Sequence, residues 1–200
     1  MSQPNNIVRV FIALDLPSAA KAALTQTMER LQLEITRGVR WVDPSGIHLT
    51  LKFLGNINGS LVEPVFQAMS RSAGGSQPFQ LRLEGLGAFP DLRQPRVLWA
   101  GAEGDLPSLG HLQERVDREV APVGFALEQR GFNPHLTLGR VRDSVAPPQR
   151  QGIGAIMSQT SLAPSEPWTV RELHLIQSNF TPTGTFYTSM GSVPLAAAAP

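Results

Sequence analysis

Residues 48–51 read His48-Leu49-Thr50-Leu51, and the same four letters return as His135-Leu136-Thr137-Leu138. The chain has four histidines, so half of them occur in one repeated tetrapeptide. Side chains alternate across a β-strand, and each histidine therefore shares a face with its threonine while the two leucines share the other face. Each copy predicts a strand with one packed face and one polar face.

The segments around the two copies mix helix and strand patterns without a regular strand-helix-strand alternation. This order favours an α+β fold over a doubly wound parallel sheet. A helix, a turn and a His-bearing strand occur once in each half, which indicates weak internal symmetry. We expect strands at 7–14, 39–42, 47–54, 79–83, 97–100, 132–141, 170–178 and 185–190, and helices at 18–34, 61–71, 109–120 (with Ser108 as a candidate cap) and 153–157.

The composition narrows the possible function classes. The chain has 200 residues, of which 42% are hydrophobic, enough for one domain or two small lobes. No apolar run reaches the roughly 18 residues of a membrane span, and the N-terminus lacks a signal pattern, so we expect a cytoplasmic protein without a membrane partner. Cysteine is absent, which excludes disulfides, thiolate zinc sites and cysteine nucleophiles.

The charge balance bears on the partner. There are 17 basic and 16 acidic residues, so affinity for nucleic acid has to come from locally placed charge. A small anionic group held in a cleft fits this balance better than a long duplex does.

The repeated histidine and threonine predict acid-base chemistry on a phosphate. Imidazole exchanges a proton near neutral pH, and a hydroxyl donates a hydrogen bond to an anionic oxygen. Two such pairs facing each other would place one phosphate between an acid and a base, as in-line cleavage requires. A single copy would more often be a core histidine beside a β-forming threonine, but the duplication argues against that reading. No carboxylate or cysteine accompanies either copy, so we expect no metal.

The sequence resembles the two-histidine (2H) phosphoesterases, and within them the RNA 2',3'-cyclic phosphodiesterases once described as bacterial 2'-5' RNA ligases. The resemblance covers nearly the whole chain. Its segments are Arg9 to Leu14, Arg40 to Gly55 with the first motif, Pro134 to Arg140 with the second, and Leu173 to Ser178 continuing through Gly184 and Tyr187.

The resemblance implies one bilobal domain over residues 1–200, with two similar lobes, each an antiparallel sheet with helices, around a central cleft. We expect a short disordered tail at about 195–200. The resemblance also implies that His48 donates a proton, that His135 accepts one, and that Thr50 and Thr137 bind phosphate oxygens.

Four further residues are candidates for substrate binding. By strict alternation Lys52 lies on the His48 face and could support a phosphate, or it could be a solvated strand-end lysine. Arg140 could neutralise the anion, but only if a bulge or strand end turns it to the His135 face. Trp41 and Phe11 could stack a base, with core packing as the alternative. The other two histidines, His111 and His174, are expected to be structural.

The resemblance implies an enzyme that hydrolyses RNA or nucleotide ends bearing a 2',3'-cyclic phosphate to 2'-phosphomonoesters, and we expect it to act without a cofactor and as a monomer. Ligation is an alternative on the same residues, because a 5'-hydroxyl could replace water as the nucleophile. A non-catalytic RNA-binding module is the other alternative, but it gives no reason for paired histidines.

Overall fold

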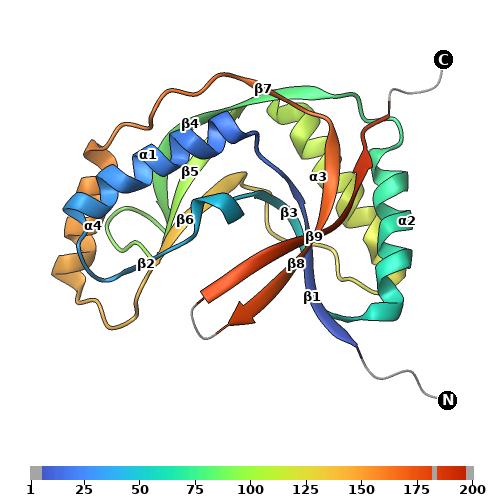
Figure 1. The fold of residues 1–200 in the computed structure, drawn as a ribbon, viewed down its shortest axis with the longest axis horizontal. Coiled ribbons are helices and arrows are strands. Elements are labelled where there is room, and N and C mark those ends of the chain that lie inside the picture. The colour runs from blue at the N-terminus through green and yellow to red at the C-terminus, as the bar shows by residue number, and fades with distance from the viewer. Residues whose placement is uncertain (1–5, 182–183, 197–200) are drawn as a thin grey trace.

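The computed structural model describes residues 6–181 and 184–196, and its fold is α+β, as the sequence predicts (Figure 1). The four helices are α1 (Ser18–Glu34), α2 (Val62–Ala73), α3 (Leu106–Val120) and α4 (Pro147–Gln159). The strands are β1 (Ile7–Leu14), β2 (Val39–Trp41), β3 (Leu49–Asn58), β4 (Phe79–Phe89), β5 (Val97–Gly104), β6 (His135–Val141), β7 (Trp168–Val170), β8 (Glu172–Thr181) and β9 (Gly184–Pro194).

The strands form two antiparallel sheets, one for each copy of the motif. The first sheet has the order β3-β1-β8-β9 and holds Thr50, while the second has the order β2-β6-β5-β4-β7 and holds His135. Helices α2 and α3 pack together, α2 against β8 and β9 and α3 against β3, whereas α4 contacts α1 and β4. Strands β3 and β6 touch where the sheets meet near the middle of the molecule (Figure 1), so the fold brings the two motifs to one region.

Each motif strand contains a β-bulge directly after its threonine. In β3, Thr50 lies opposite Ala13 and Lys52 lies opposite Ile12, which leaves Leu51 as an extra residue. In β6, Leu138 is extra in the same way, because Thr137 lies opposite Trp99 and Gly139 opposite Leu98. A bulge lets two consecutive residues face the same side. The third residue after each threonine, Phe53 or Arg140, therefore returns to the face of the histidine.

Several sequence-based boundaries needed correction. Helix α3 begins earlier than expected, and Asp105 rather than Ser108 caps it, because the Asp105 carboxylate accepts a hydrogen bond from the Ser108 N–H at 3.0 Å. Helix α4 is longer than the short helix expected there, since two prolines begin it instead of interrupting it. Strand β7 was not expected. It has three residues, too few for a visible alternation.

The folded part of the chain extends as far as Leu195, further than expected. Strand β9 continues to Pro194, Leu195 is buried, and the Leu195 N–H donates to the carbonyl of Arg171 at 2.7 Å. Position 195 therefore belongs to the core and not to a disordered tail. Residues 197–200 of that expected tail, and residue 183 between the strands expected at 170–178 and 185–190, lie outside the described residues.

Candidate active site

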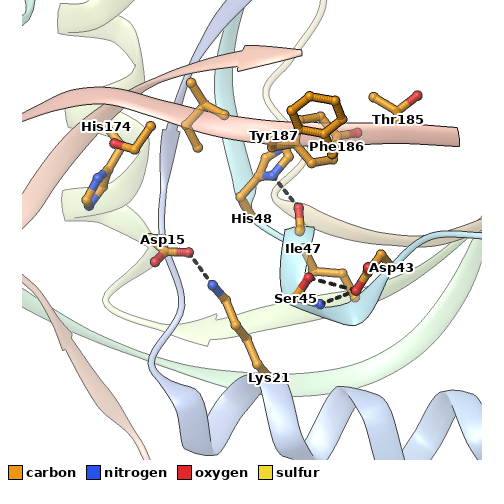
Figure 2. A pocket seen from close by; sticks show the side chains of 13 residues that line it. Asp15, Lys21, Asp43, Ser45, Ile47, His48, His174, Thr185, Phe186 and Tyr187 are labelled. Atoms are coloured by element: carbon orange, nitrogen blue, oxygen red, sulfur yellow. Dashed lines mark hydrogen bonds and ion pairs between the residues drawn. The ribbon is translucent and has the colours of Figure 1, made fainter. Parts of the chain in front are cut away.

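A tight turn sets the orientation of His48. Residues Pro44–Gly46 form one turn of 3-10 helix, which the Asp43 side chain caps by accepting hydrogen bonds from the Ser45 N–H at 2.9 Å and the Ser45 hydroxyl at 2.7 Å. These bonds hold the pKa of the Asp43 carboxyl below its usual range. The Gly46 carbonyl at the end of this turn lies 2.7 Å from Nδ1 of His48 (Figure 2).

His135 has the same arrangement in the second lobe. The carbonyl of Asn133, again two residues earlier in the chain, lies 2.8 Å from Nδ1 of His135. A carbonyl only accepts hydrogen bonds, so in both residues Nδ1 has to bear the proton that it donates. The neutral form of each ring then has its lone pair on Nε2, which is the nitrogen left for proton transfer.

Aromatic rings fix the plane of each imidazole. Phe11 stacks on His48 with ring centroids 4.3 Å apart, and Tyr187 meets the same imidazole edge-on at 4.9 Å. Phe89 meets His135 edge-on, also at 4.9 Å. Phe11 packs in the core, as the alternative to base stacking anticipated, because the residue is only 1% exposed and its ring face is occupied by His48. Its role is to hold the histidine.

The two threonines lie where the repeat predicts. Thr50 and Thr137 are half-buried, each on the same sheet face as its histidine. Within the described part of the chain neither hydroxyl has a hydrogen-bond partner. Both hydroxyls can therefore donate to a ligand.

Lys52 does not lie on the His48 face, and this prediction is wrong. The bulge at Leu51 turns Lys52 into the interior, where only 8% of its surface is exposed. Its amine forms an ion pair with Asp117 of α3 and donates to the carbonyl of Ala126 at 2.6 Å. Strict alternation failed here because no residue type in this segment marks the bulge.

Arg140 lies on the His135 face, and the bulge that it required is present. The residue is exposed at the end of β6. Phe53 holds the matching place in the first lobe, with its ring 63% exposed and 5.6 Å from that of Phe11. Sequence reasoning missed Phe53, although aligning the two motifs would have paired it with Arg140.

Trp41 packs against the core, as the alternative to base stacking anticipated. It lies opposite Gly139 across the β2–β6 pair and is partly buried against the main core. A Cβ on Gly139 would lie 2.8 Å from Cγ1 of Val39 and 3.1 Å from Cε3 of Trp41. Glycine is thus needed at 139 to let β2 and its tryptophan approach.

A cavity of about 250 Å³ lies beside His48 (Figure 2). The Asp15–Lys21 ion pair, with 2.8 Å between the charged atoms, lies on one side of it, and Tyr187 and His174 also line it. His174 lies 3.3 Å from the Glu172 carboxylate. His135 is not part of this cavity. Burial of the imidazole lowers the pKa of His48 to about 4, because removal from water disfavours the charged ring.

Residues 6–181 and 184–196 contain neither a metal-binding cluster nor a membrane-spanning helix. No three side chains among the histidines, aspartates and glutamates there are grouped so that they could hold a metal ion. No helix in those ranges is both long and apolar enough to cross a membrane.

Comparison with known proteins identifies the family. The family model described as LigT-like phosphoesterase matches residues 14–99 and 105–187, which include both motifs. The chain belongs to this family. It is 31% identical to the RNA 2',3'-cyclic phosphodiesterase of Methanothermobacter thermautotrophicus, over 92% of this chain and 96% of that protein. The corresponding Archaeoglobus fulgidus protein is 32% identical, over 90% and 96%.

Solved structures, including that of Escherichia coli LigT, share the fold. A Thermus thermophilus protein superposes with a TM-score of 0.76 at 27% identity, covering 95% of this chain and 98% of that one. Escherichia coli LigT in complex with 3'-AMP superposes with a TM-score of 0.73 at 25% identity, covering 95% and 99%. The bilobal α+β fold is therefore that of LigT-like phosphoesterases.

Proposed function

We propose that this LigT-like phosphoesterase hydrolyses 2',3'-cyclic phosphates at RNA ends to 2'-phosphomonoesters, with His48 and His135 as the acid-base pair. The observation that supports this most is the identical backbone anchoring of the two imidazoles. Each donates from Nδ1 to the carbonyl two residues earlier and leaves Nε2 for the substrate. A core histidine has no need of this duplication. The names of the curated relatives supply the substrate class.

The reaction then needs two proton transfers around one phosphorus. Nε2 of His135 takes a proton from water, and the water oxygen attacks phosphorus in line with the 3'-oxygen. The P–O3' bond breaks, and Nε2 of His48 gives its proton to the departing oxygen, leaving a 3'-hydroxyl and a 2'-phosphate. Thr50 and Thr137 donate to the non-bridging oxygens, and the Arg140 guanidinium offsets their charge.

The proposed acid has to gain its proton against the effect of burial. In the free protein the low pKa of His48 keeps its imidazole neutral near pH 7. A bound phosphate anion opposes this effect, because a negative charge beside the ring favours the imidazolium. Substrate binding thus helps to create the protonated acid. Nε2 donates that proton while Nδ1 stays bonded to Gly46.

The direct test is incubation of the protein with 2',3'-cyclic mononucleotides and with short RNAs that end in a 2',3'-cyclic phosphate. We expect turnover to a 2'-phosphate, resolved by chromatography against 2'- and 3'-phosphate standards. A 3'-phosphate product would keep the two-histidine chemistry and reverse the orientation of the substrate. Tight binding of the cyclic ends without any product would instead identify a binding module and overturn the enzymatic proposal.

The pH dependence of turnover should show the lowered pKa of His48. The productive enzyme holds one proton on the pair, so kcat/KM falls on the acidic side as the pH drops through the lower of the two pKa values. Burial lowers the pKa of His48 to about 4, so the limb that this residue controls should lie near pH 4. In the pH profile of kcat, the same limb should lie at a higher pH than in the profile of kcat/KM, because bound phosphate raises the pKa of His48. Steady-state profiles from pH 3.5 to 9 measure both.

The same profiles in His48→Ala assign the limb. We expect the residual activity of this variant to lose the limb near pH 4 and the decline on the alkaline side, because only the general base His135 then has to be neutral. His111→Ala, which alters an exposed residue on α3, should keep the native profile. An acidic limb that persists unchanged in His48→Ala would show that another group controls it.

Turnover should not depend on a divalent metal. Imidazoles transfer the protons in the proposed mechanism, and the described residues hold no cluster of three metal-binding side chains. Dialysis against excess EDTA should leave kcat within about twofold of the untreated value. Loss of activity, with recovery at one equivalent of one divalent ion, would replace this mechanism with a metal-assisted one.

A further inference from the structure

Two arginines face each other at the edge of the second sheet. In the β2–β6 pair Arg40 lies directly opposite Arg140, and both residues are exposed. Like charges that lie directly opposite on one sheet face destabilise the strand pair. Across residues 6–181 and 184–196 neither guanidinium forms an ion pair with a carboxylate. The fold therefore keeps two positive charges together without a neutralising partner.

The pair lies on the same face as the second motif. The bulge at Leu138 turns Arg140 to the side of His135 and Thr137, and opposite residues of an antiparallel pair share a face, so Arg40 lies there too. On its other side Arg140 faces Val97 of β5, an uncharged neighbour. Strand β2 is the last strand of the sheet, which leaves Arg40 at an open edge. The positive charge thus extends from the motif to the rim of the sheet.

The substrate has to supply the matching negative charge. The reacting cyclic phosphate is a monoanion, and Arg140, the residue nearer the motif along β6, is enough to offset it. Arg40 lies one strand further out, beyond Arg140. In the proposed substrate, an RNA end, the next anion is the phosphodiester that joins the terminal nucleotide to the preceding one. A guanidinium group binds phosphate oxygens through a pair of parallel hydrogen bonds, so Arg40 suits such a linkage.

We propose that Arg40, next to Arg140, forms a second anion subsite that binds the phosphodiester on the 5' side of the terminal nucleotide. This inference rests on the proposed function and deepens it. It makes the substrate an oligonucleotide, since a mononucleotide leaves Arg40 without a ligand.

The test compares a 2',3'-cyclic mononucleotide with a dinucleotide of the same terminal base that ends in a 2',3'-cyclic phosphate. Arg40→Gln should lower kcat/KM for the dinucleotide about tenfold, mainly through KM, and leave the mononucleotide value unchanged. Arg40→Lys should recover part of the loss. Arg30→Gln, which removes an exposed positive charge from α1, is the matched control and should leave kcat/KM unchanged for both substrates.

A dinucleotide with an uncharged methylphosphonate linkage isolates the charge. With this substrate, kcat/KM of the unaltered enzyme should fall to the value that Arg40→Gln shows with the normal dinucleotide. The kcat/KM of Arg40→Gln should not change when the linkage loses its charge. The dinucleotide should also show a steeper decline of affinity with salt than the mononucleotide, and Arg40→Gln should reduce the difference.

Each remaining outcome decides against one proposal. If Arg40→Gln lowers kcat/KM equally for both substrates, Arg40 acts at the reacting phosphate and the second subsite is overturned. The second subsite is also overturned if Arg40→Gln lowers kcat/KM for neither substrate. If the unaltered protein turns over neither substrate, the proposed function fails. The subsite is then judged by titration with a mononucleotide and a dinucleotide that each end in a 2'-phosphate. Equal affinities for Arg40→Gln and the unaltered protein would overturn it there as well.

Discussion

Replacing His135 with alanine should lower kcat by roughly 10² to 10⁴, the loss expected when a positioned acid or base is removed. His48→Ala should show a loss of the same order. Both reductions should appear mainly in kcat and not in KM, because the threonines and Arg140 remain to bind the phosphate. The measurement is steady-state turnover of a 2',3'-cyclic phosphate, with circular dichroism to show that the variants are folded.

His111→Ala is the control for this pair. His111 is exposed on α3, so its loss should leave kcat within about twofold. His174 is a less clean control because it lines the cavity beside His48. Full activity of His135→Ala, or equal losses for His48, His135 and His111, would contradict the assignment.

The double variant tests whether the histidines act as one unit. Catalytic groups that work together are strongly non-additive, so the second replacement should reduce kcat much less than the first did. Two losses that multiply would mean that the imidazoles act in separate steps. The shared anchoring of the rings gives a structural reason to expect one unit.

The sequence predicted the parts of the site that depend on local pattern. The two histidines and two threonines follow from the repeat, because alternation along a strand is fixed over three residues. The α+β class followed from the order of helices and strands. The turn before β3 was also visible, as Pro44 and Gly46 mark it in the sequence.

What the sequence did not predict depends on pairing between distant segments. A bulge is set by the register of neighbouring strands, so the faces of Lys52 and Phe53 could not be read from alternation alone. Phe11 is covered by His48, a contact between residues 37 positions apart that only the folded sheet creates. The carbonyl anchors at Gly46 and Asn133 precede the motifs and were equally invisible.

Lys52 is a candidate phosphate ligand by sequence but forms a buried ion pair in the structure. Its replacement should therefore have a large effect on stability. Its amine, bonded to Asp117 and to the carbonyl of Ala126, joins β3 to α3 and to the loop before β6. Asp117 also accepts from the Glu128 N–H at 2.9 Å, so one carboxylate holds both the lysine and that loop. Removing one partner of a buried pair leaves the other charge without compensation, which typically costs about 3–5 kcal/mol.

Lys52→Met should therefore lower the free energy of unfolding by about 3–5 kcal/mol, measured by urea denaturation, and Asp117→Asn should have an effect in the same direction. The double variant Lys52→Met/Asp117→Leu should recover much of the loss, since an apolar pair of similar volume leaves no buried charge.

Activity distinguishes this structural role from the phosphate contact that strict alternation suggests. If the lysine only joins the elements, the folded fraction of Lys52→Met should turn over substrate with a nearly unchanged KM. If it contacts phosphate, Lys52→Met should unfold at the normal urea concentration and lose affinity for the substrate. A loss of stability below about 1 kcal/mol together with a tenfold rise in KM would refute the structural role, because an exposed and solvated lysine has that signature and a buried ion pair does not.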